Sequence, residues 1–241
     1  MIEIKSASIS FGKKNVLQNV SVKSEIMSNT VILGKNGSGK SVLLKIAAGL
    51  LVPDSGEVLF DGKKISHEDY FRANKLSIGY VFQKGGLFDS MNLFDNVAFP
   101  LRRKGLTENE IPDIVLYNLR RVGLEGSEEK FPTELSGGMQ KRAGIARVLA
   151  MKPEVILYDD PAAGLDPVLT DSIADLILEI RETEKTTSLI VTHDMKFAEK
   201  IADEIVLLDS SQIVFYGDKN KFFSLEDPFA HQFVKGEIEG P

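Results

Sequence analysis

Residues 34–41 decide the fold, and they read Gly34-Lys35-Asn36-Gly37-Ser38-Gly39-Lys40-Ser41. This stretch fits the pattern G-x-x-x-x-G-K-S, a loop whose backbone N–H groups surround the phosphates of a nucleotide. The apolar residues 30–33 stand before it and predict a buried strand, while residues 41–49 predict a helix that ends at glycine. Strand, glycine loop and helix in this order are the context that the motif requires, and they favour nucleotide binding over a chance glycine-rich turn.

The chemistry of the loop follows from its backbone. Glycines allow successive N–H groups to turn toward one point without side-chain interference, and the helix adds the positive end of its dipole. Lys40 is predicted to reach the β- and γ-phosphates, and the Ser41 hydroxyl is predicted to bind Mg²⁺.

Length and composition narrow the class of protein. The chain has 241 residues, of which 43% are hydrophobic, so it suits one large domain or two small lobes with a normal core. A net charge of −6 gives no sign of nucleic-acid binding, and the lack of cysteine excludes disulfides and thiolate chemistry. The N-terminus lacks the features of a signal peptide, and no apolar run approaches the ~20 residues that cross a bilayer. We expect a soluble, cytoplasmic protein whose role at a membrane depends on a partner.

The first part of the chain predicts several strands. Residues 2–10 alternate between apolar and polar side chains, residues 15–26 form a second such run, and residues 57–62 form a short third one. We expect these strands to be antiparallel and to lie beside the nucleotide-binding core. Phe11 ends the first strand; it either stacks on a base, which an aromatic face suits, or belongs to the core, the commoner place for such a residue.

The middle of the chain changes from strand to helix. Residues 76–82 predict a buried strand followed by Gln83, whose amide is expected at the edge where open α/β sheets bind ligands. Residues 86–150 carry helical patterns and form a candidate helical subdomain. Within it, residues 107–110 resemble a capping box, although Pro112 obscures where that helix starts.

A second glycine segment opens the last helix of this region. Ser136 is a good N-cap for a helix over residues 138–151. The plain interpretation is a well-capped surface helix. The paired glycines Gly137 and Gly138 point further, because they expose bare backbone donors to an anion at a helix N-terminus.

The last part of the chain predicts strands that end in polar residues. Residues 155–159 read as a buried strand that delivers Asp159 to a Mg²⁺–phosphate site, with Asp160 directly after it. Asp166 is expected to cap a helix that begins at Pro167. Residues 187–191 predict another strand, after which His193 is either structural or in contact with phosphate. Two further strands, over residues 204–209 and 212–216, precede a polar tail over residues 218–241 with a short helix.

Together these motifs resemble one family, the nucleotide-binding subunits of ABC transporters, over nearly the whole chain. Residues 34–41 resemble the family's Walker A loop, residues 155–159 its Walker B strand and residues 164–166 its D-loop. Gln83 resembles the Q-loop glutamine, and His193 resembles the switch histidine. Residues 135–138 resemble the family signature, with Met139 where glutamine is commonest. Phe11 resembles the aromatic residue that stacks on adenine.

The resemblance implies an α/β P-loop NTPase fold, with a mostly parallel core sheet, an N-terminal antiparallel β subdomain and a helical subdomain. Residues 1–241 are then a single ABC ATPase domain, in which residues 1–85 and 151–217 form the core, residues 86–150 the helical subdomain and residues 218–241 the tail. Two copies of the chain are expected to form a head-to-tail homodimer with two ATP molecules between them.

The resemblance also implies a role for each site residue. Asp160 is expected to orient the attacking water, His193 to steady the γ-phosphate, and Gln83 to act with both in catalysis. Mg²⁺ is expected at Ser41, Gln83 and Asp159. The implied ATP contacts are Phe11, Gly34, Lys35, Asn36, Gly37, Ser38, Gly39, Lys40, Ser41, Val42, Ser136, Gly137 and Gly138.

Finer matches resemble the ATPases of Mla/Mce-type lipid transport systems. They lie in residues 81–91 and 94–101, in the signature Leu-Ser-Gly-Gly-Met, and in residues 233–236 and 239–241. This resemblance implies phospholipid transport between membranes, integral-membrane permease partners and an Mce-type lipid-binding protein in the same complex. It places the chain on the cytoplasmic face of the inner membrane, and it implies no nucleic-acid partner.

One residue departs from the family pattern. A glutamate normally follows the Walker B aspartate, and here that position holds Asp160, which is one methylene shorter. Because a misplacement near 1 Å can cost about 100-fold in rate, we expect slow hydrolysis. The alternatives are a transporter ATPase with a different cargo, or a regulatory subunit that ATP only clamps. A DNA-repair or translation protein is disfavoured, since the chain has neither a coiled-coil insertion nor a duplicated cassette.

Overall fold

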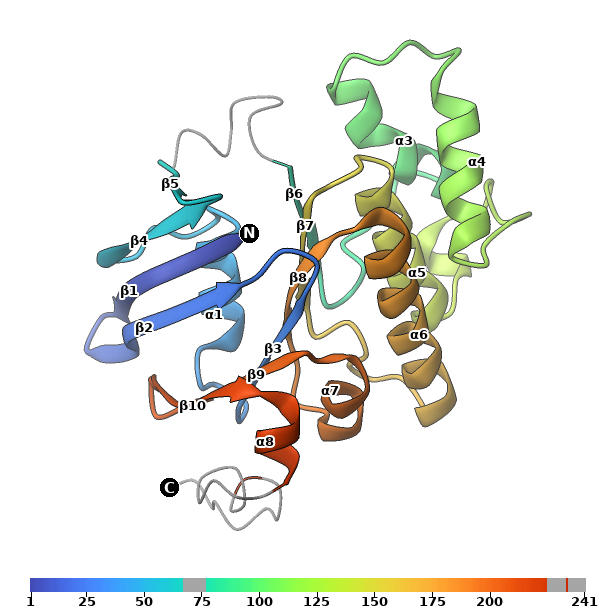
Figure 1. The fold of residues 1–241 in the computed structure, drawn as a ribbon. Helices are drawn as coiled ribbons and strands as arrows, with labels where there is room; N and C mark the ends of the chain where they lie inside the picture. The colour runs from blue at the N-terminus through green and yellow to red at the C-terminus, as the bar shows by residue number, and fades with distance from the viewer. Residues whose placement is uncertain (67–76, 225–232, 234–241) are drawn as a thin grey trace.

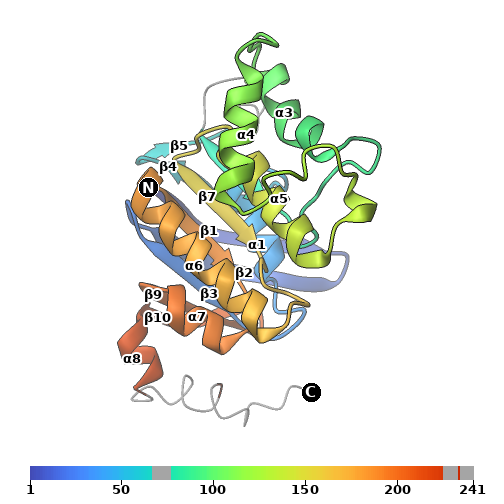
Figure 2. The ribbon, with the colours of Figure 1, turned by 90° about the vertical axis from the view of Figure 1, so that its right-hand side faces the viewer.

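The computed structural model describes residues 1–66, 77–224 and 233, and it contains two β-sheets (Figure 1). One sheet has four strands in the order β2-β1-β4-β5, and the other has six strands in the order β10-β9-β3-β8-β7-β6. Helix α1 (Lys40–Ala47) lies between the two sheets (Figure 1). The remaining helices lie on the other face of the six-stranded sheet or beyond its ends (Figures 1 and 2).

The small sheet is antiparallel, as the sequence predicted. It contains β1 (Ile2–Phe11), β2 (Lys14–Ser24), β4 (Ser55–Phe60) and the short β5 (Lys63–Lys64). Strand β1 is central and pairs antiparallel with both β2 and β4. Its burial alternates at first and then shifts at irregularities in the register, which explains why only the start of the strand shows a clean period of two.

The large sheet is mostly parallel and carries the nucleotide loop. Strands β3 (Asn29–Leu33), β8 (Thr187–Val191), β7 (Val155–Asp159) and β6 (Ile78–Val81) run parallel to one another. All residues of β3, β7 and β8 are buried, as expected for parallel strands covered on both faces. The opposite edge is formed by β9 (Glu204–Asp209), parallel to β3, and by β10 (Gln212–Asp218), antiparallel to β9. The predicted strand over residues 76–82 is shorter in the structure, and residue 76 lies outside the described part.

The large sheet separates two hydrophobic cores. One core lies between the sheets and contains Ile32 together with α1 and the inner face of the antiparallel sheet. The other contains Val31 and Leu33 and packs against α6 (Pro167–Glu184) and α7 (Met195–Ile201). Since neighbouring residues of a strand face opposite sides, the all-apolar run after residue 30 serves both cores.

Residues 86–150 contribute helices to the described structure and no strands. These are α3 (Leu93–Arg103), α4 (Ile111–Arg121), the 3₁₀ turn η1 (Pro132–Glu134) and α5 (Gly137–Leu149). Figure 2 shows α3 and α4 at one end of the molecule and α8 (Lys219–Phe223) at the other.

The helix starts that the sequence predicted are found with one correction. Ser136 caps α5 by accepting from the N–H of Met139, and Asp166 caps α6. The predicted capping box at residues 107–110 does not start a helix. Its carboxylate, on Glu110, accepts from the backbone N–H of Thr107 at 2.9 Å in the turn before α4, which begins at Ile111.

The described part of the tail ends in a short helix. In α8, Phe222 is fully buried, and its ring packs edge-on against Phe215 and Phe223. Residues 225–232 and 234–241, which carry part of the resemblance to lipid-transport ATPases, lie outside the described residues. Within the described ranges, no helix combines the length and the apolar character needed to span a membrane.

Candidate nucleotide site

A pocket of about 270 Å³ lies at the carboxyl ends of the parallel strands, beside the glycine loop. It brings together residues from distant parts of the sequence: Val16, Asn36, Gly37, Gly39, Lys40, Ser41, Val42, Gln83, Asp159, Asp160 and Val191. The edge of an open α/β sheet where the parallel strands end is the usual place for a ligand in this architecture.

The backbone at Gly39 requires glycine. Its φ is +105°, and a Cβ there would stand 2.8 Å from the Leu17 side chain and 2.9 Å from the Val16 carbonyl oxygen. Gly39 precedes the first turn of α1 and has no side chain to cap it. The N–H groups of that turn are therefore available to an anion rather than to a capping side chain.

Lys40 is held inside the loop. Its Nζ donates to the carbonyl oxygens of Gly34 at 2.6 Å and Lys35 at 2.8 Å, and the residue is buried. Burial lowers the pKa of Lys40, while the nearby carboxylates Asp159 and Asp160 act in the opposite direction. A partly desolvated ammonium on a fixed loop is suited to binding phosphate oxygens.

Two more polar atoms of the loop fit an anion. Nζ of Lys35 and Oγ of Ser38 are buried and have no hydrogen-bond partner in the part of the chain that the structure describes. Buried polar atoms normally have partners. The loop therefore offers donors that the protein itself leaves unused, which fits a nucleotide phosphate.

Ser41 and Asp159 form the candidate magnesium site. The Ser41 hydroxyl donates to Oδ1 of Asp159 at 2.7 Å, so both oxygens lie within reach of one ion. Groups of three or more acidic, histidine or cysteine side chains suited to a metal are absent from the described residues. The donor set still fits Mg²⁺, because this ion is commonly held by one or two carboxylates and by the substrate's phosphates.

Tyr80 is a site residue that the sequence analysis missed. From β6, its hydroxyl donates to Oδ2 of Asp159 at 2.8 Å. Burial, followed by the charge of Asp159 and this hydrogen bond, raises the pKa of Tyr80, so the hydroxyl stays protonated and remains a donor. An aromatic residue inside a strand reads as core in the sequence, and no local signal distinguishes this one.

Asp160 is joined to the end of strand β8. Its backbone adopts φ +48°, and its N–H donates to the Val191 carbonyl oxygen at 2.9 Å. Its carboxylate accepts from Thr192 Oγ1 at 3.1 Å and lies 2.8 Å from His193 Nδ1. The structure thus brings His193 to Asp160, and Thr192 is a second residue that the sequence analysis missed.

Helix α5 contacts the loop after β6, residues 83–86, through three positions. Nζ of Lys141 donates to the Gln83 carbonyl oxygen at 2.9 Å and approaches that of Asp160 at 3.4 Å, while Arg147 donates to the Gly86 carbonyl oxygen at 2.6 Å. Between them, Gly144 packs so closely that an added Cβ would stand 2.5 Å from the Gly85 oxygen. Three positions on one face of α5 therefore fix residues 83–86, which connect the pocket to the helical region.

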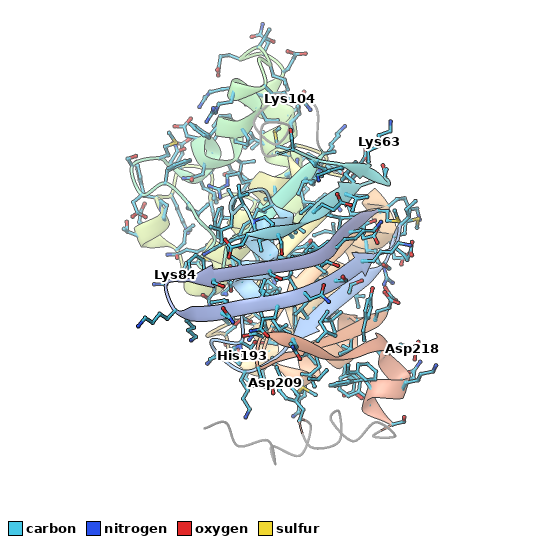
Figure 3. All side chains as sticks on the ribbon, turned by 90° about the vertical axis from the view of Figure 1, so that its left-hand side faces the viewer. Lys63, Lys84, Lys104, His193, Asp209 and Asp218 are labelled. Atoms are coloured by element: carbon cyan, nitrogen blue, oxygen red, sulfur yellow. The ribbon has the colours of Figure 1, made fainter. Side chains whose placement is uncertain are left out.

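Some predicted site residues lie elsewhere. Phe11 is 52% exposed, so it is not a core residue; it does not line the pocket, and its stacking on adenine stays a prediction. Ser136, Gly137 and Gly138 start α5 and also lie outside the pocket lining of their own chain. In the view of Figure 3, Lys84 (next to Gln83) and His193 lie toward the end where β1 turns into β2, and Lys63 and Asp218 lie toward the opposite end.

The glycine loop between β3 and α1, the mostly parallel sheet and the acidic strand end define a P-loop ATPase. The family model described as ABC transporter matches residues 17–163. The chain belongs to the ABC transporter family, and it is an ATPase of that family.

Relatives match along the full chain. A probable ribonucleotide transport ATP-binding protein of Mycobacterium leprae is 42% identical over 244 residues, covering 100% of this chain and 70% of the relative. The intermembrane phospholipid transport ATP-binding protein MlaF of Haemophilus influenzae is 37% identical, covering 100% of this chain and 92% of the relative.

A solved structure has the same fold. It is a dimeric, post-hydrolysis state of the ATP-binding cassette MJ0796 bound to ADP and Pi, with a TM-score of 0.82 and 30% identity, covering 91% of this chain and 99% of the other. The predicted fold class, an ABC ATPase with an antiparallel β subdomain, a parallel sheet and helices, is confirmed by this match and by the sheet topology.

Proposed function

We propose that this chain binds and hydrolyses ATP to drive phospholipid transport between membranes, as a homodimer that holds two ATP molecules between its subunits. The relatives named for intermembrane phospholipid transport, at 35–37% identity, support this cargo. The relatives named for ribonucleotide transport keep a different cargo open.

The position of the signature segment carries the proposal of a homodimer. Ser136 and Gly137 are exposed at the N-terminus of α5, outside the pocket that their own chain forms. Apart from its chain neighbours and the backbone of its own helix, no atom of the described residues lies within 4 Å of a Cβ added at Gly137, so its backbone is open to a phosphate. A second copy supplies this helix N-terminus to the pocket, and each ATP then lies between one glycine loop and one signature segment.

In this proposal, residues on one side hold the phosphates and the metal. Lys35, Ser38 and Lys40 donate to the phosphate oxygens, and Ser41 and Asp159 hold Mg²⁺ with Gln83 nearby. When bound, Mg²⁺ neutralises charge on the β- and γ-phosphate oxygens.

Asp160 and His193 then act on the attacking water. The Asp160 carboxylate accepts a hydrogen bond from the water, orients it toward the γ-phosphorus and takes up its proton as general base, while the bond between the γ-phosphorus and the bridging oxygen breaks and ADP leaves. His193, whose Nδ1 faces Asp160, presents the other edge of its imidazole to the γ-phosphate. Thr192 keeps the carboxylate in place from the buried side.

A larger cavity of about 890 Å³ is the proposed docking site for the permease. It lies between residues 77–88 and the helices of residues 86–150, the proposed helical subdomain, and its wall is largely apolar. Phe82, Phe88 and Phe99 contribute rings to this wall, where two basic side chains outnumber one acidic side chain: Lys104 and Arg147 against Glu154. An amphipathic cytoplasmic helix with an acidic residue fits this surface.

The proposed location follows from that contact. The chain binds the cytoplasmic face of the inner membrane through its permease, and an Mce-type lipid-binding protein belongs to the same complex. In this scheme residues 1–85 and 151–217 hold ATP through the glycine loop, and residues 86–150 supply the signature segment to the partner's ATP and transmit its binding to the permease.

Cysteine crosslinking tests the homodimer, because the natural chain contains no cysteine. We expect the single variants Ser136→Cys and Asn36→Cys, mixed with each other and with ATP and Mg²⁺, to form a disulfide-linked heterodimer. Lys63→Cys, on the antiparallel sheet, is the matched control partner and should give none. Failure of the Ser136–Asn36 pair to crosslink, even in the complex with the permease, would contradict the shared site.

Lipid analysis tests the cargo. The complex purified with its permease from native membranes should contain phospholipid when examined by mass spectrometry, and its ATPase rate should respond to added phospholipid. Enrichment of another solute, with no phospholipid, would favour a transporter of different cargo. A steady-state assay with no turnover in the full complex would favour the alternative in which ATP only clamps the dimer.

A further inference from the structure

Tyr80 connects the two cavities. Its hydroxyl donates to Oδ2 of Asp159 at the nucleotide pocket, at 2.8 Å. The same residue contributes to the wall of the larger cavity, where its ring lies 4.6 Å, centroid to centroid, from the ring of Phe82. Phe82 lines that cavity and is 41% exposed.

The Asp159 carboxylate has a hydroxyl on each oxygen. Ser41, on the first turn of α1, donates to Oδ1, and Tyr80, on the neighbouring strand β6, donates to Oδ2. The two donors come from different elements, so together they fix the rotation of the carboxylate. A ligand that is oriented in this way binds a metal more tightly, and loss of such a supporting hydrogen bond typically costs 10–100-fold in metal affinity.

We propose that Tyr80 is a positioning residue, which orients Asp159 for a divalent cation and ties that orientation to the aromatic wall of the larger cavity through Phe82. This inference rests on the proposed function, since it takes Asp159 as a ligand of Mg²⁺. It goes beyond that function by naming a residue that no motif of the sequence marks.

Tyr158 provides a matched control next to the same carboxylate. It precedes Asp159 on β7, is fully buried, and its hydroxyl has no hydrogen-bond partner among the described residues. Removal of the Tyr158 hydroxyl therefore takes away one oxygen from a more deeply buried ring on the neighbouring strand, and it removes no donor to Asp159. Tyr80→Phe removes one oxygen as well, but takes a donor from Oδ2.

The test measures the affinity of the full chain for a non-hydrolysable ATP analogue, by isothermal titration calorimetry with and without MgCl₂. In Tyr80→Phe we expect the gain in affinity that Mg²⁺ gives to fall by about tenfold, while the metal-free affinity stays at the wild-type value. Tyr158→Phe should keep the full gain. Phe82→Leu keeps both tyrosine hydroxyls and should lose part of the gain, because Tyr80 loses its ring contact.

The outcomes separate this inference from the proposed function. Wild-type protein that binds no analogue, or binds it without any effect of Mg²⁺, would overturn the nucleotide–magnesium site itself. A normal wild type with an equal Mg²⁺ effect in Tyr80→Phe would overturn only the role of Tyr80. An unchanged Mg²⁺ effect in Phe82→Leu would overturn the connection to the larger cavity.

Discussion

Nδ1 of His193 lies 2.8 Å from Oδ2 of Asp160, so the residues that follow the neighbouring strands β8 and β7 form one pair. The backbone supports the same arrangement, because the Asp160 N–H donates to the Val191 carbonyl oxygen at the end of β8. The short acidic side chain is thus anchored at the strand ends, rather than extended freely into the pocket.

The length of the Asp160 side chain is expected to limit the rate. In the complex with the permease, Asp160→Glu should hydrolyse ATP faster, because the extra methylene carries the carboxylate further into the pocket. Asp160→Asn should lose about 100-fold or more, as loss of a general base does. Steady-state phosphate release measures both rates. The melting temperature of each variant is measured as a control, because the Asp160 backbone has φ +48°, which suits Asp better than Glu. A slower Glu variant would contradict limitation by reach.

Thr192 is expected to affect turnover rather than binding. It is fully buried, and its hydroxyl donates to Asp160 while accepting from the N–H of Asp194 at 3.1 Å. Thr192→Val keeps the shape but removes a hydrogen bond to a charged group, so kcat should fall about tenfold with little change in KM. Thr192→Ser restores the hydroxyl and should restore the rate. Equal rates in the Val and Ser variants would argue against this role.

The contact between α5 and residues 83–86 is expected to leave no room for a methyl group. Gly144→Ala should lower the free energy of unfolding by about 1–3 kcal/mol, as overpacking does, because its Cβ would stand 2.5 Å from a backbone oxygen of Gly85. Gly217→Ala is the control, since its Cβ would make only an ordinary contact, at 3.6 Å, with Phe215. Urea denaturation compares them, and a Gly144→Ala protein as stable as the control would show that the helix can shift.

The ionised carboxylate of Glu204 is expected to lower the free energy of unfolding at neutral pH. Burial first, and then the charge of Glu25, raise its pKa above the ordinary 4.5, with a smaller contribution from Asp203; Thr30 and Lys23 oppose the shift. When the pKa of a carboxyl group is higher in the folded than in the unfolded state, its contribution to the free energy of unfolding is fully present below the unfolded-state pKa. That contribution is lost as the pH rises through the folded-state pKa. Glu204→Gln should therefore be more stable than the wild type at pH 7, and the difference should shrink toward pH 4.5 in denaturation experiments. A constant difference across this range would contradict the titration.

Much of the fold could be predicted from the sequence, because many elements carry a local signal and the motifs together resemble one family; α7 and the short β5 were not predicted. The glycine loop, the apolar strands and the caps at Ser136 and Asp166 depend on neighbours in the chain, and the structure contains them all. The start of α4 was predicted less well. The capping-box pattern at residues 107–110 placed it too early, and the helix begins at Ile111, with Pro112 in its first turn.

The site was predicted less completely, because several of its contacts join distant segments. Tyr80 and Thr192 lie in ordinary strand-like surroundings, and only the pairing of β6, β7 and β8 brings them to Asp159 and Asp160. Lys141 looks like part of a basic helix face, yet its ammonium is buried against the Gln83 carbonyl oxygen. No pattern within one segment encodes such contacts.

The contacts between α5 and residues 83–86 also limit which chimeras can be made between this protein and its relatives. A chimera that exchanged residues 86–150 alone would leave a foreign Lys141 facing the native Gln83 carbonyl oxygen and a foreign Arg147 facing the native Gly85 carbonyl oxygen. It would also require a foreign helix to match the close contact between Gly144 and Gly85. An exchange that keeps the helix and the loop from the same parent, beginning at residue 83, preserves all of these contacts. Grafting experiments that alter permease choice should therefore place the first crossover between the end of β6 and residue 83.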